Sequence, residues 1–197
     1  MRIMETVQPL IHQIGGHVAL DFANTVSWRG EPREIDHIAS GAALLGWAKQ
    51  NGLVEPSVCI EGDADSFVSC GRRLRQAIRG AFEGVLAATE TEPAYADLLD
   101  IARESLGSAI LSGVPANIRY SKVNDAIFGK IAWAAIELLG SDRLRRVKIC
   151  EPHNCRWLFL DTTKNGTRRW CDMGTCGTRA KVTQHRAQNR GKHRSSE

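Results

Sequence analysis

Apolar residues recur at helical spacing along most of the first 140 residues. The clearest case is segment 63–89, where hydrophobic residues return every three or four positions and predict one long helix. Its buried face is predicted to consist of Phe67, Gly71, Leu74, Ile78, Ala81, Phe82 and Val85. Segment 35–50 follows the same rule, and another helix is predicted from Pro93 to Ile110. The inward residues of these two helices are predicted to be Ile38, Ala42, Leu45 and Trp47, and Leu98, Leu99, Ala102, Leu106 and Ile110.

Two further segments complete the predicted body. Residues 125–139 are apolar on nearly every side, which places their helix at the centre of a helical bundle. Segment 113–120 breaks the helical pattern, and Ile118 and Tyr120 alternate with polar neighbours, which predicts a short hairpin or strand. Four arginines of the long helix, Arg72, Arg73, Arg75 and Arg79, are interpreted as a solvated face in preference to a phosphate site.

The first ordered stretch, residues 15–30, carries an apolar and a polar stripe. Read as a helix, it aligns Val18 with Phe22 and Val26, while polar residues at the same spacing form a second stripe. A candidate ligand pocket for a small-molecule effector consists of His17, Asp21, Asn24 and Arg29. The favoured alternative is that these side chains cap and tie down the start of the chain.

Four cysteines near the C-terminus have the spacing of a zinc site. Four residues separate Cys150 from Cys155, four separate Cys171 from Cys176, and fifteen lie between the pairs. Each pair can form a tight turn that presents two thiolates to one metal, and four thiolates close the coordination sphere. The sequence therefore predicts one structural Zn²⁺ held by all four cysteines, with no open position for catalysis.

The residues around these cysteines predict a small finger. Trp157 to Leu160 form an apolar run typical of a strand, Asn165-Gly166 form a turn, and residues 167–170 are predicted to return as the second strand. A basic helix is predicted from Gly177 to Gln188. The expected fold is mainly α: an N-terminal helical bundle (1–140) with a small β-hairpin, a treble-clef-like zinc finger (141–190) of knuckle, hairpin and helix, and a basic disordered tail (191–197).

Charge is divided unevenly between these parts. Residues 1–140 carry 12 Lys/Arg and 17 Asp/Glu, whereas residues 141–197 carry 14 Lys/Arg and 5 Asp/Glu. Attraction for a polyanion therefore lies in the finger. On a helical projection the basic residues form two ridges beside a strip of small residues, an arrangement suited to a nucleic-acid groove. The candidate nucleic-acid contacts are Arg168, Arg169, Arg179, Lys181, Gln184, Arg186 and Arg190.

Composition limits the remaining choices. With 43% hydrophobic residues, the 197-residue chain can bury a proper core. We expect a cytoplasmic protein without a membrane segment, because no apolar run approaches 18 residues and the N-terminus lacks a signal-peptide pattern. In that compartment Cys59 and Cys70 are expected to be buried free thiols, not a disulfide.

Two stretches resemble known families. GGHVALDFANTVSWRG, residues 15–30, is similar to the opening of the ABATE domain, and residues 150–188, from CEPHNC to HRAQ, are similar to the CGNR zinc finger that accompanies it. The resemblance implies a bacterial transcription regulator linked to stress. The letters CGNR name four consecutive residues of the finger, which are Cys-Gly-Thr-Arg at 176–179 in this chain, so Thr178 replaces the expected Asn. Its hydroxyl can still form a hydrogen bond near the helix start, but it offers no amide NH₂.

Three classes of function remain open. The favoured one is a zinc-dependent, DNA-binding transcription regulator, whose N-terminal domain senses a small ligand or forms a homodimer. The alternative is a zinc-stabilised interaction module that contacts RNA polymerase or another transcription protein without binding DNA. An enzyme is disfavoured, because the chain has no catalytic triad order and no Gly-rich phosphate loop, and its one acid–base pair, His17 and Asp21, has no nucleophile beside it.

Overall fold

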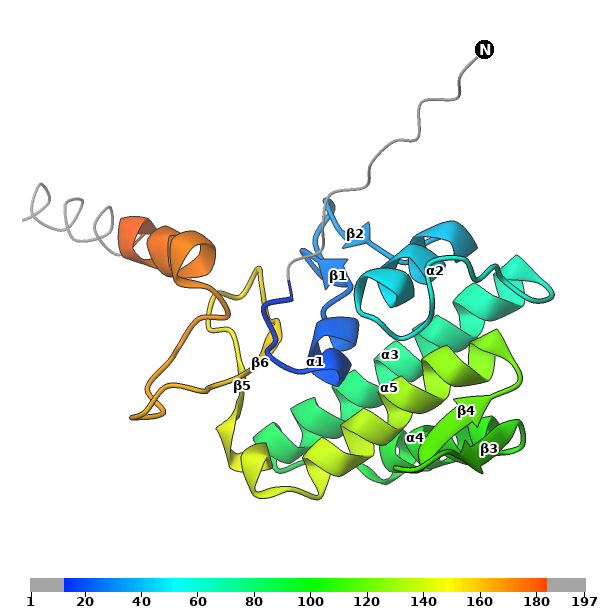
Figure 1. Cartoon of the computed structure of the whole chain (residues 1–197). Coiled ribbons are helices and arrows are strands. Elements are labelled where there is room, and N and C mark those ends of the chain that lie inside the picture. The colour runs from blue at the N-terminus through cyan, green and yellow to red at the C-terminus, as the bar shows by residue number, and fades with distance from the viewer. Residues whose placement is uncertain (1–12, 184–197) are drawn as a thin grey trace, which may run out of the picture.

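The computed structural model describes residues 13–183 and shows a helical body with a small finger at one end (Figure 1). The body contains α1 (Val18–Ala23), α2 (Gly41–Gln50), α3 (Ala64–Ala87), α4 (Glu92–Leu106) and α5 (Val123–Leu139). α5 packs against α1, α3 and α4, and its Ile127, Ile131, Ala132 and Ala135 are fully buried. The predicted central position of this apolar helix is confirmed, as is the mainly α fold.

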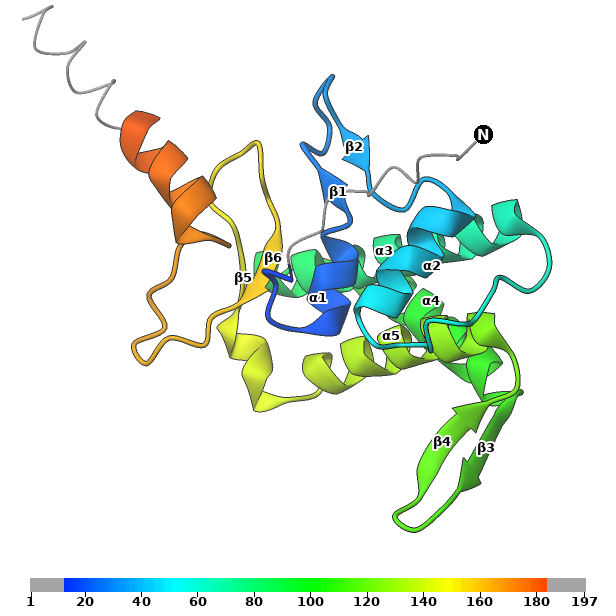
Figure 2. The same ribbon diagram turned by 45° about the horizontal axis from the view of Figure 1, so that its top comes forward.

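Within residues 13–183, three antiparallel two-stranded sheets accompany the helices. They pair β1 (Val26–Ser27) with β2 (Ile35–Asp36), β3 (Ala109–Ser112) with β4 (Asn117–Tyr120), and β5 (Val147–Ile149) with β6 (Leu158–Leu160). The β3–β4 hairpin confirms the expected break in the helical pattern and projects from the body (Figure 2). The β5–β6 hairpin belongs to the finger and lies against α1.

Two predicted helices are shorter than the apolar pattern suggested. The helix predicted over 35–50 begins only at Gly41, because Ser40 caps it by accepting the Ala43 N–H and residues 35–36 pair as β2. Ala42 is exposed. The helix predicted to reach Ile110 ends at Leu106, since the chain turns at Gly107 into β3. Leu99, Leu106 and Ile110 were predicted to point inward and are instead 45–61% exposed.

Two arginines of α3 are buried, contrary to the interpretation of a solvated face. Arg75 forms a two-pronged ion pair with Asp36, at 2.7 and 3.1 Å, and reaches Thr25. Arg79 pairs with Glu83 and donates to the Arg156 carbonyl at 3.0 Å. Buried guanidinium groups of this kind act as multi-pronged ties. Arg75 anchors the β1–β2 hairpin, and Arg79 joins the body to the finger.

The two remaining cysteines are free thiols, as expected, but neither is fully buried. Cys59 is exposed in the loop before α3. Cys70 is half-buried on α3, where burial first and the nearby Glu104 second raise the pKa of its thiol to about 11. Cys70 is therefore protonated at neutral pH and a poor nucleophile.

The body and the finger share one hydrophobic core. Val147, Leu158 and Leu160 of the β5–β6 hairpin lie in the same cluster as Leu20, Ile78 and Ile131. Asn24 donates to the Leu158 carbonyl and accepts the Leu158 N–H, both at 2.8 Å, and is 2% exposed. The Trp157 indole donates to the Val26 carbonyl at 2.9 Å. Since these contacts fix β6 against α1 and β1, the finger is held rigidly on the body.

Asp21 makes stability depend on pH. It lies in α1, 7% exposed, and accepts the Gly15 N–H at 2.7 Å. Burial raises the pKa of its carboxyl to about 6, although the Gly15 bond opposes this. Because the folded pKa exceeds the unfolded one, near 3.9, stability falls as pH rises through 6. Asn does not titrate, so the free energy of unfolding of Asp21→Asn should rise relative to that of the wild type by about 1 kcal/mol as the pH goes from 5 to 7. Urea unfolding at each pH measures this change.

Asp63→Asn is the matched control for that measurement. Asp63 caps α3 by accepting the Ser66 N–H at 2.7 Å, and this bond holds the pKa of its carboxyl below its usual range. Asn is an equally good cap, and no titration of Asp63 is expected above pH 5. If the free energy of unfolding of Asp21→Asn differed from that of the wild type by the same amount at every pH, the assignment of this titration to Asp21 would be contradicted.

Candidate metal centre

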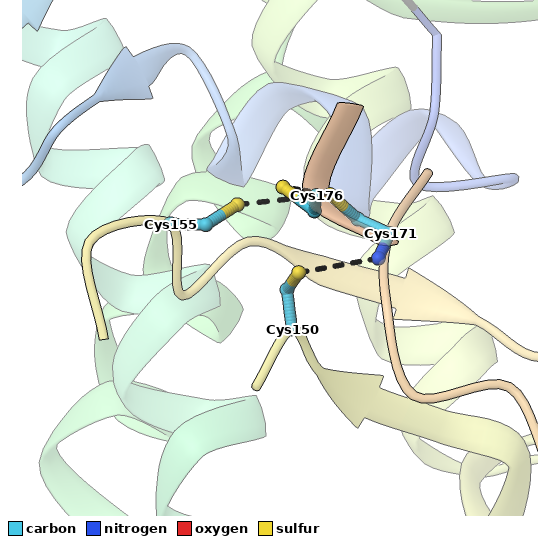
Figure 3. Close-up of side chains that lie close together, drawn as sticks. All are labelled: Cys150, Cys155, Cys171 and Cys176. Carbon is cyan, nitrogen blue, oxygen red and sulfur yellow. Dashed lines mark hydrogen bonds between the residues drawn. The ribbon is translucent and has the colours of Figure 1, made fainter. Parts of the chain in front are cut away.

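Four cysteine sulfurs from two turns of the finger gather in one place (Figure 3). Cys150 follows β5 and Cys155 precedes β6, while Cys171 and Cys176 lie before and within η2 (Met173–Gly177), a single π-helical turn. All four sulfurs are within 4.8 Å of one another. The Cys155 and Cys171 sulfurs are 3.6 Å apart, and those of Cys171 and Cys176 are 3.7 Å apart.

These distances fit a tetrahedral Zn²⁺. Zn–S bonds of ~2.3 Å at tetrahedral angles place neighbouring sulfurs about 3.8 Å apart. The Cys171 N–H also donates to the Cys150 sulfur at 3.2 Å, a bond that favours a thiolate there. Hydrogen bonds with Cys150 and Cys155, and then burial, raise the pKa of Cys171, and a divalent cation removes that penalty. The centre is a closed, four-thiolate structural zinc site.

The first cysteine pair lies in the turn of the β5–β6 hairpin. Cys150 donates its N–H to the Trp157 carbonyl at 2.8 Å, and the Cys155 N–H donates to Pro152. The predicted hairpin between 157–160 and 167–170 is therefore wrong, because β6 pairs with β5 upstream of Cys150. Residues 167–170 form no strand, and one bond from the Glu151 N–H to the Arg169 carbonyl brings them beside the knuckle.

A partly buried ion pair holds the loop that follows β6, which the sequence had predicted to be the turn between two strands. Lys148 Nζ donates to Asp161 Oδ2 at 2.7 Å and to the carbonyls of Gly166 and Arg168 at 2.6 and 3.1 Å. Asp161 also accepts N–H groups of Thr163 and Arg168. Burial alone raises the pKa of Asp161, but these donors outweigh it and hold that pKa far below its usual range.

Neither residue of this pair was singled out from the sequence. The available signal was Asp161 directly after a buried strand and two positions before Thr163, the pattern of an Asx turn. Lys148 gave no signal, because it stands in a run of basic residues and its buried position depends on the fold.

The second cysteine pair is set by a capped turn. Asp172 accepts the Thr175 N–H and hydroxyl at 2.7 and 2.9 Å, and residues 178–183 continue from η2 as an α-helix. Thr178 donates its hydroxyl to the Met173 carbonyl at 3.2 Å, so it does bond near the helix start. A Cβ at Gly177 would lie 3.3 Å from the Trp170 ring, so glycine allows the helix to begin close to the zinc site.

The candidate nucleic-acid contacts have different surroundings. Arg168 is engaged inside the finger: it donates to the Trp170 and Cys171 carbonyls and lies over the Phe159 ring. Arg169 is exposed and paired with Glu151. Arg179 and Lys181 are exposed on helix 178–183, with Arg179 stacked 4.9 Å from the centre of the Trp28 ring. The other three candidates, Gln184, Arg186 and Arg190, lie outside the described residues, as does the predicted tail 191–197.

The candidate ligand-pocket residues have different surroundings. His17 occupies the N-cap position of α1 without a side-chain capping bond, and among the described residues its half-buried ring has no partner at Nδ1. Arg29 is exposed and lies 3.4 Å from Glu83. Asp21 and Asn24 bond to the backbone as described above. An effector that used Asn24 would have to break its two bonds to Leu158, so the ligand pocket stays a prediction.

Comparison with known families agrees with this geometry. Residues 146–189 match the CGNR zinc finger, and residues 16–142 match ABATE, described as "Putative stress-induced transcription regulator". No curated protein matches the chain. Within the described residues, no helix is long and apolar enough to cross a bilayer. The helical body and the four-cysteine finger share one core. The chain therefore belongs to the ABATE family of regulators and carries a CGNR zinc finger.

Proposed function

We propose that the protein is a zinc-dependent regulator that binds DNA through its finger. The observation that carries this proposal is the attachment of a basic finger to an acidic body through a shared core. Residues 141–183 carry ten Lys/Arg and four Asp/Glu. Three of these acids are used internally or paired: Asp161 by Lys148, Asp172 by Thr175 and Glu151 by Arg169. The field around the finger is therefore positive and draws a polyanion to this end of the molecule.

Helix 178–183 is the element best placed to meet DNA. It leaves the zinc site on the outer side of the finger, away from the body (Figures 1 and 2). Arg179 and Lys181 are exposed on it. Trp28 of the β1–β2 hairpin stacks on Arg179, and Arg33 lies 3.4 Å from the centre of the same ring. A stacked guanidinium keeps its edge donors for a phosphate while its plane is held in place.

One observation favours the interaction-module alternative. The projecting β3–β4 hairpin exposes Ile110, Leu111, Val114 and Ile118, of which Leu111 is 70% exposed. Exposed aliphatic residues clustered on one hairpin are typical of protein contacts. Such a surface suits a homodimer or a transcription protein and is compatible with DNA binding by the finger at the other end of the body.

DNA binding is tested by fluorescence anisotropy with zinc-loaded protein and duplexes of random sequence. We expect log affinity to fall linearly with log salt, with a slope of about −0.9 for each phosphate contacted. Arg179→Ala with Arg186→Ala should abolish most of this binding. Arg103→Ala, an exposed arginine on α4 paired with Asp100, is the matched control and should bind like the wild type.

The opposite outcome identifies the alternative. A zinc-loaded, folded protein without DNA affinity at low salt would contradict the proposed function. Co-purification of that protein with RNA polymerase, retained in Arg179→Ala, would then support the interaction module.

A further inference from the structure

A hollow of about 220 Å³ lies on the finger, away from the zinc, between η1 (Asp142–Arg146) and the loop that follows β6. η1 is a short 3₁₀ turn that leads from α5 into β5. The hollow is lined by Arg143, Arg146, Leu160, Asp161, Thr162 and Thr163. None of these residues belongs to the zinc site or to the helix that follows it.

The accessible charge of this hollow is positive. Asp161 is its single acidic lining residue, but it is 2% exposed and is neutralised by Lys148. Its oxygens also accept from the Thr163 N–H, the Thr163 hydroxyl and the Arg168 N–H. Arg143 is exposed and Arg146 half-buried, and Lys164 follows in the same loop. The exposed carboxylate nearby in sequence is Asp142, next to Arg143.

The hollow offers unused donors from both walls. Arg146 gives one N–H to the Thr163 carbonyl at 3.1 Å, and a guanidinium has five. Among residues 13–183, Arg143 has no hydrogen-bond or ion-pair partner, and the Thr162 side chain is exposed. Guanidinium forks and a hydroxyl that line one hollow match the several oxygens of a tetrahedral phosphate.

The walls of the hollow are fixed before any ligand arrives. Lys148 ties the loop to β5 through Asp161, Gly166 and Arg168. Gly166 has φ +60°, and a Cβ there would lie 2.5 Å from Arg146 Nη1. Glycine at this position therefore leaves room for the Arg146 side chain between the two walls. A site with fixed walls loses little entropy on binding.

We propose that this hollow binds a backbone phosphate of DNA and is a second anchoring point beside helix 178–183. This inference rests on the proposed DNA-binding function. Both views place the loop, η1 and the helix at the same end of the molecule, so one duplex can reach both (Figures 1 and 2). Contacts to phosphates set the position and orientation of a protein on DNA without reading sequence. The hollow thus fixes how helix 178–183 approaches the groove.

The test is Arg143→Gln in the full-length, zinc-loaded protein. The salt slope of DNA binding should become shallower by about one, and affinity should fall about tenfold at ~0.1 M salt, equally for unrelated sequences. Thr162→Val should weaken binding with the slope unchanged. The matched control is Arg119→Gln, an exposed arginine on β4 at the other end of the body, which should leave both quantities unchanged.

The outcomes separate this inference from the function on which it rests. If the wild type binds DNA but Arg143→Gln has the same slope and affinity, the hollow is not an anchoring point and the DNA-binding function stands. If the wild type does not bind DNA, both fail. A third arm compares melting in inorganic phosphate and in KCl at equal ionic strength. Stabilisation by phosphate that is lost in Arg143→Gln, with DNA binding unaffected, would assign the hollow to free phosphate and overturn the proposal.

Discussion

Cys171→Ser is expected to remove zinc from the protein and to unfold the finger. Cys171 is buried and its sulfur lies 3.6 and 3.7 Å from those of Cys155 and Cys176, so its loss opens the coordination sphere. A structural zinc contributes about 10–16 kcal/mol to small modules of this kind, which is comparable to the whole stability of a typical domain, about 5–15 kcal/mol. The metal content should fall from one zinc per chain to a small fraction, as measured by atomic emission on the purified protein.

The same substitution is expected to lower the stability of the helical body. The finger contributes Leu158 and Leu160 to the shared core, and the Leu158 backbone accepts one hydrogen bond from the buried Asn24 amide and donates one to it. If β6 detaches, the Asn24 amide and the apolar face of α1 become exposed to solvent. The denaturant midpoint followed by helical circular dichroism should therefore shift down, together with the loss of the zinc.

Cys59→Ser is the matched control, since Cys59 is an exposed free thiol outside the finger. It should keep one zinc and the wild-type midpoint. A zinc-free Cys171→Ser protein whose helical body unfolds at the wild-type midpoint would show that body and finger fold independently, contrary to the shared core.

The zinc site could be predicted from the sequence because it is a local feature. Four residues lie between the two cysteines of each pair. One tetrahedral ion needs all four thiolates, so it brings the two pairs together regardless of how the strands are paired. The central position of α5 could also be predicted from the sequence, because a helix that is apolar on all sides is stable only when it is buried. Such predictions need only spacing and the chemistry of single residues.

The strand pairing of the finger could not be predicted in that way. The true partner of β6 is Val147–Ile149, three residues that follow a run of arginines and include Lys148. Such a run gives no alternating pattern, whereas Asn165-Gly166 offers a clear turn signal. The burial of Arg75 and Arg79 was hidden for a related reason: their partners Asp36 and Arg156 are distant in sequence and meet them only in the fold.

Asp161→Ala is expected to destabilise the protein by about 2–3 kcal/mol, because the carboxylate is buried and accepts charged and backbone donors, while the Lys148 side chain is 31% exposed and can be solvated. Lys148 would keep only two carbonyl partners, and the N–H groups of Thr163 and Arg168 would lose their acceptor. Since the pKa of Asp161 is held far below its usual range, the pair contributes its full stability at neutral pH. Urea unfolding at pH 7 measures the loss.

A double-mutant cycle with Lys148→Met isolates the ion pair from the rest of the loop. Met keeps the apolar stem of the lysine and removes its charge, so the single variant leaves the buried carboxylate of Asp161 without its cation. In the double variant neither charge remains, and its loss should be smaller than the sum of the single losses by about 1–3 kcal/mol. Additive losses would mean that Asp161 acts only through the N–H groups of its own loop. Because this pair also fixes one wall of the hollow beside Arg143, coupling between Lys148 and Asp161 would show that the ion pair itself stabilises that wall.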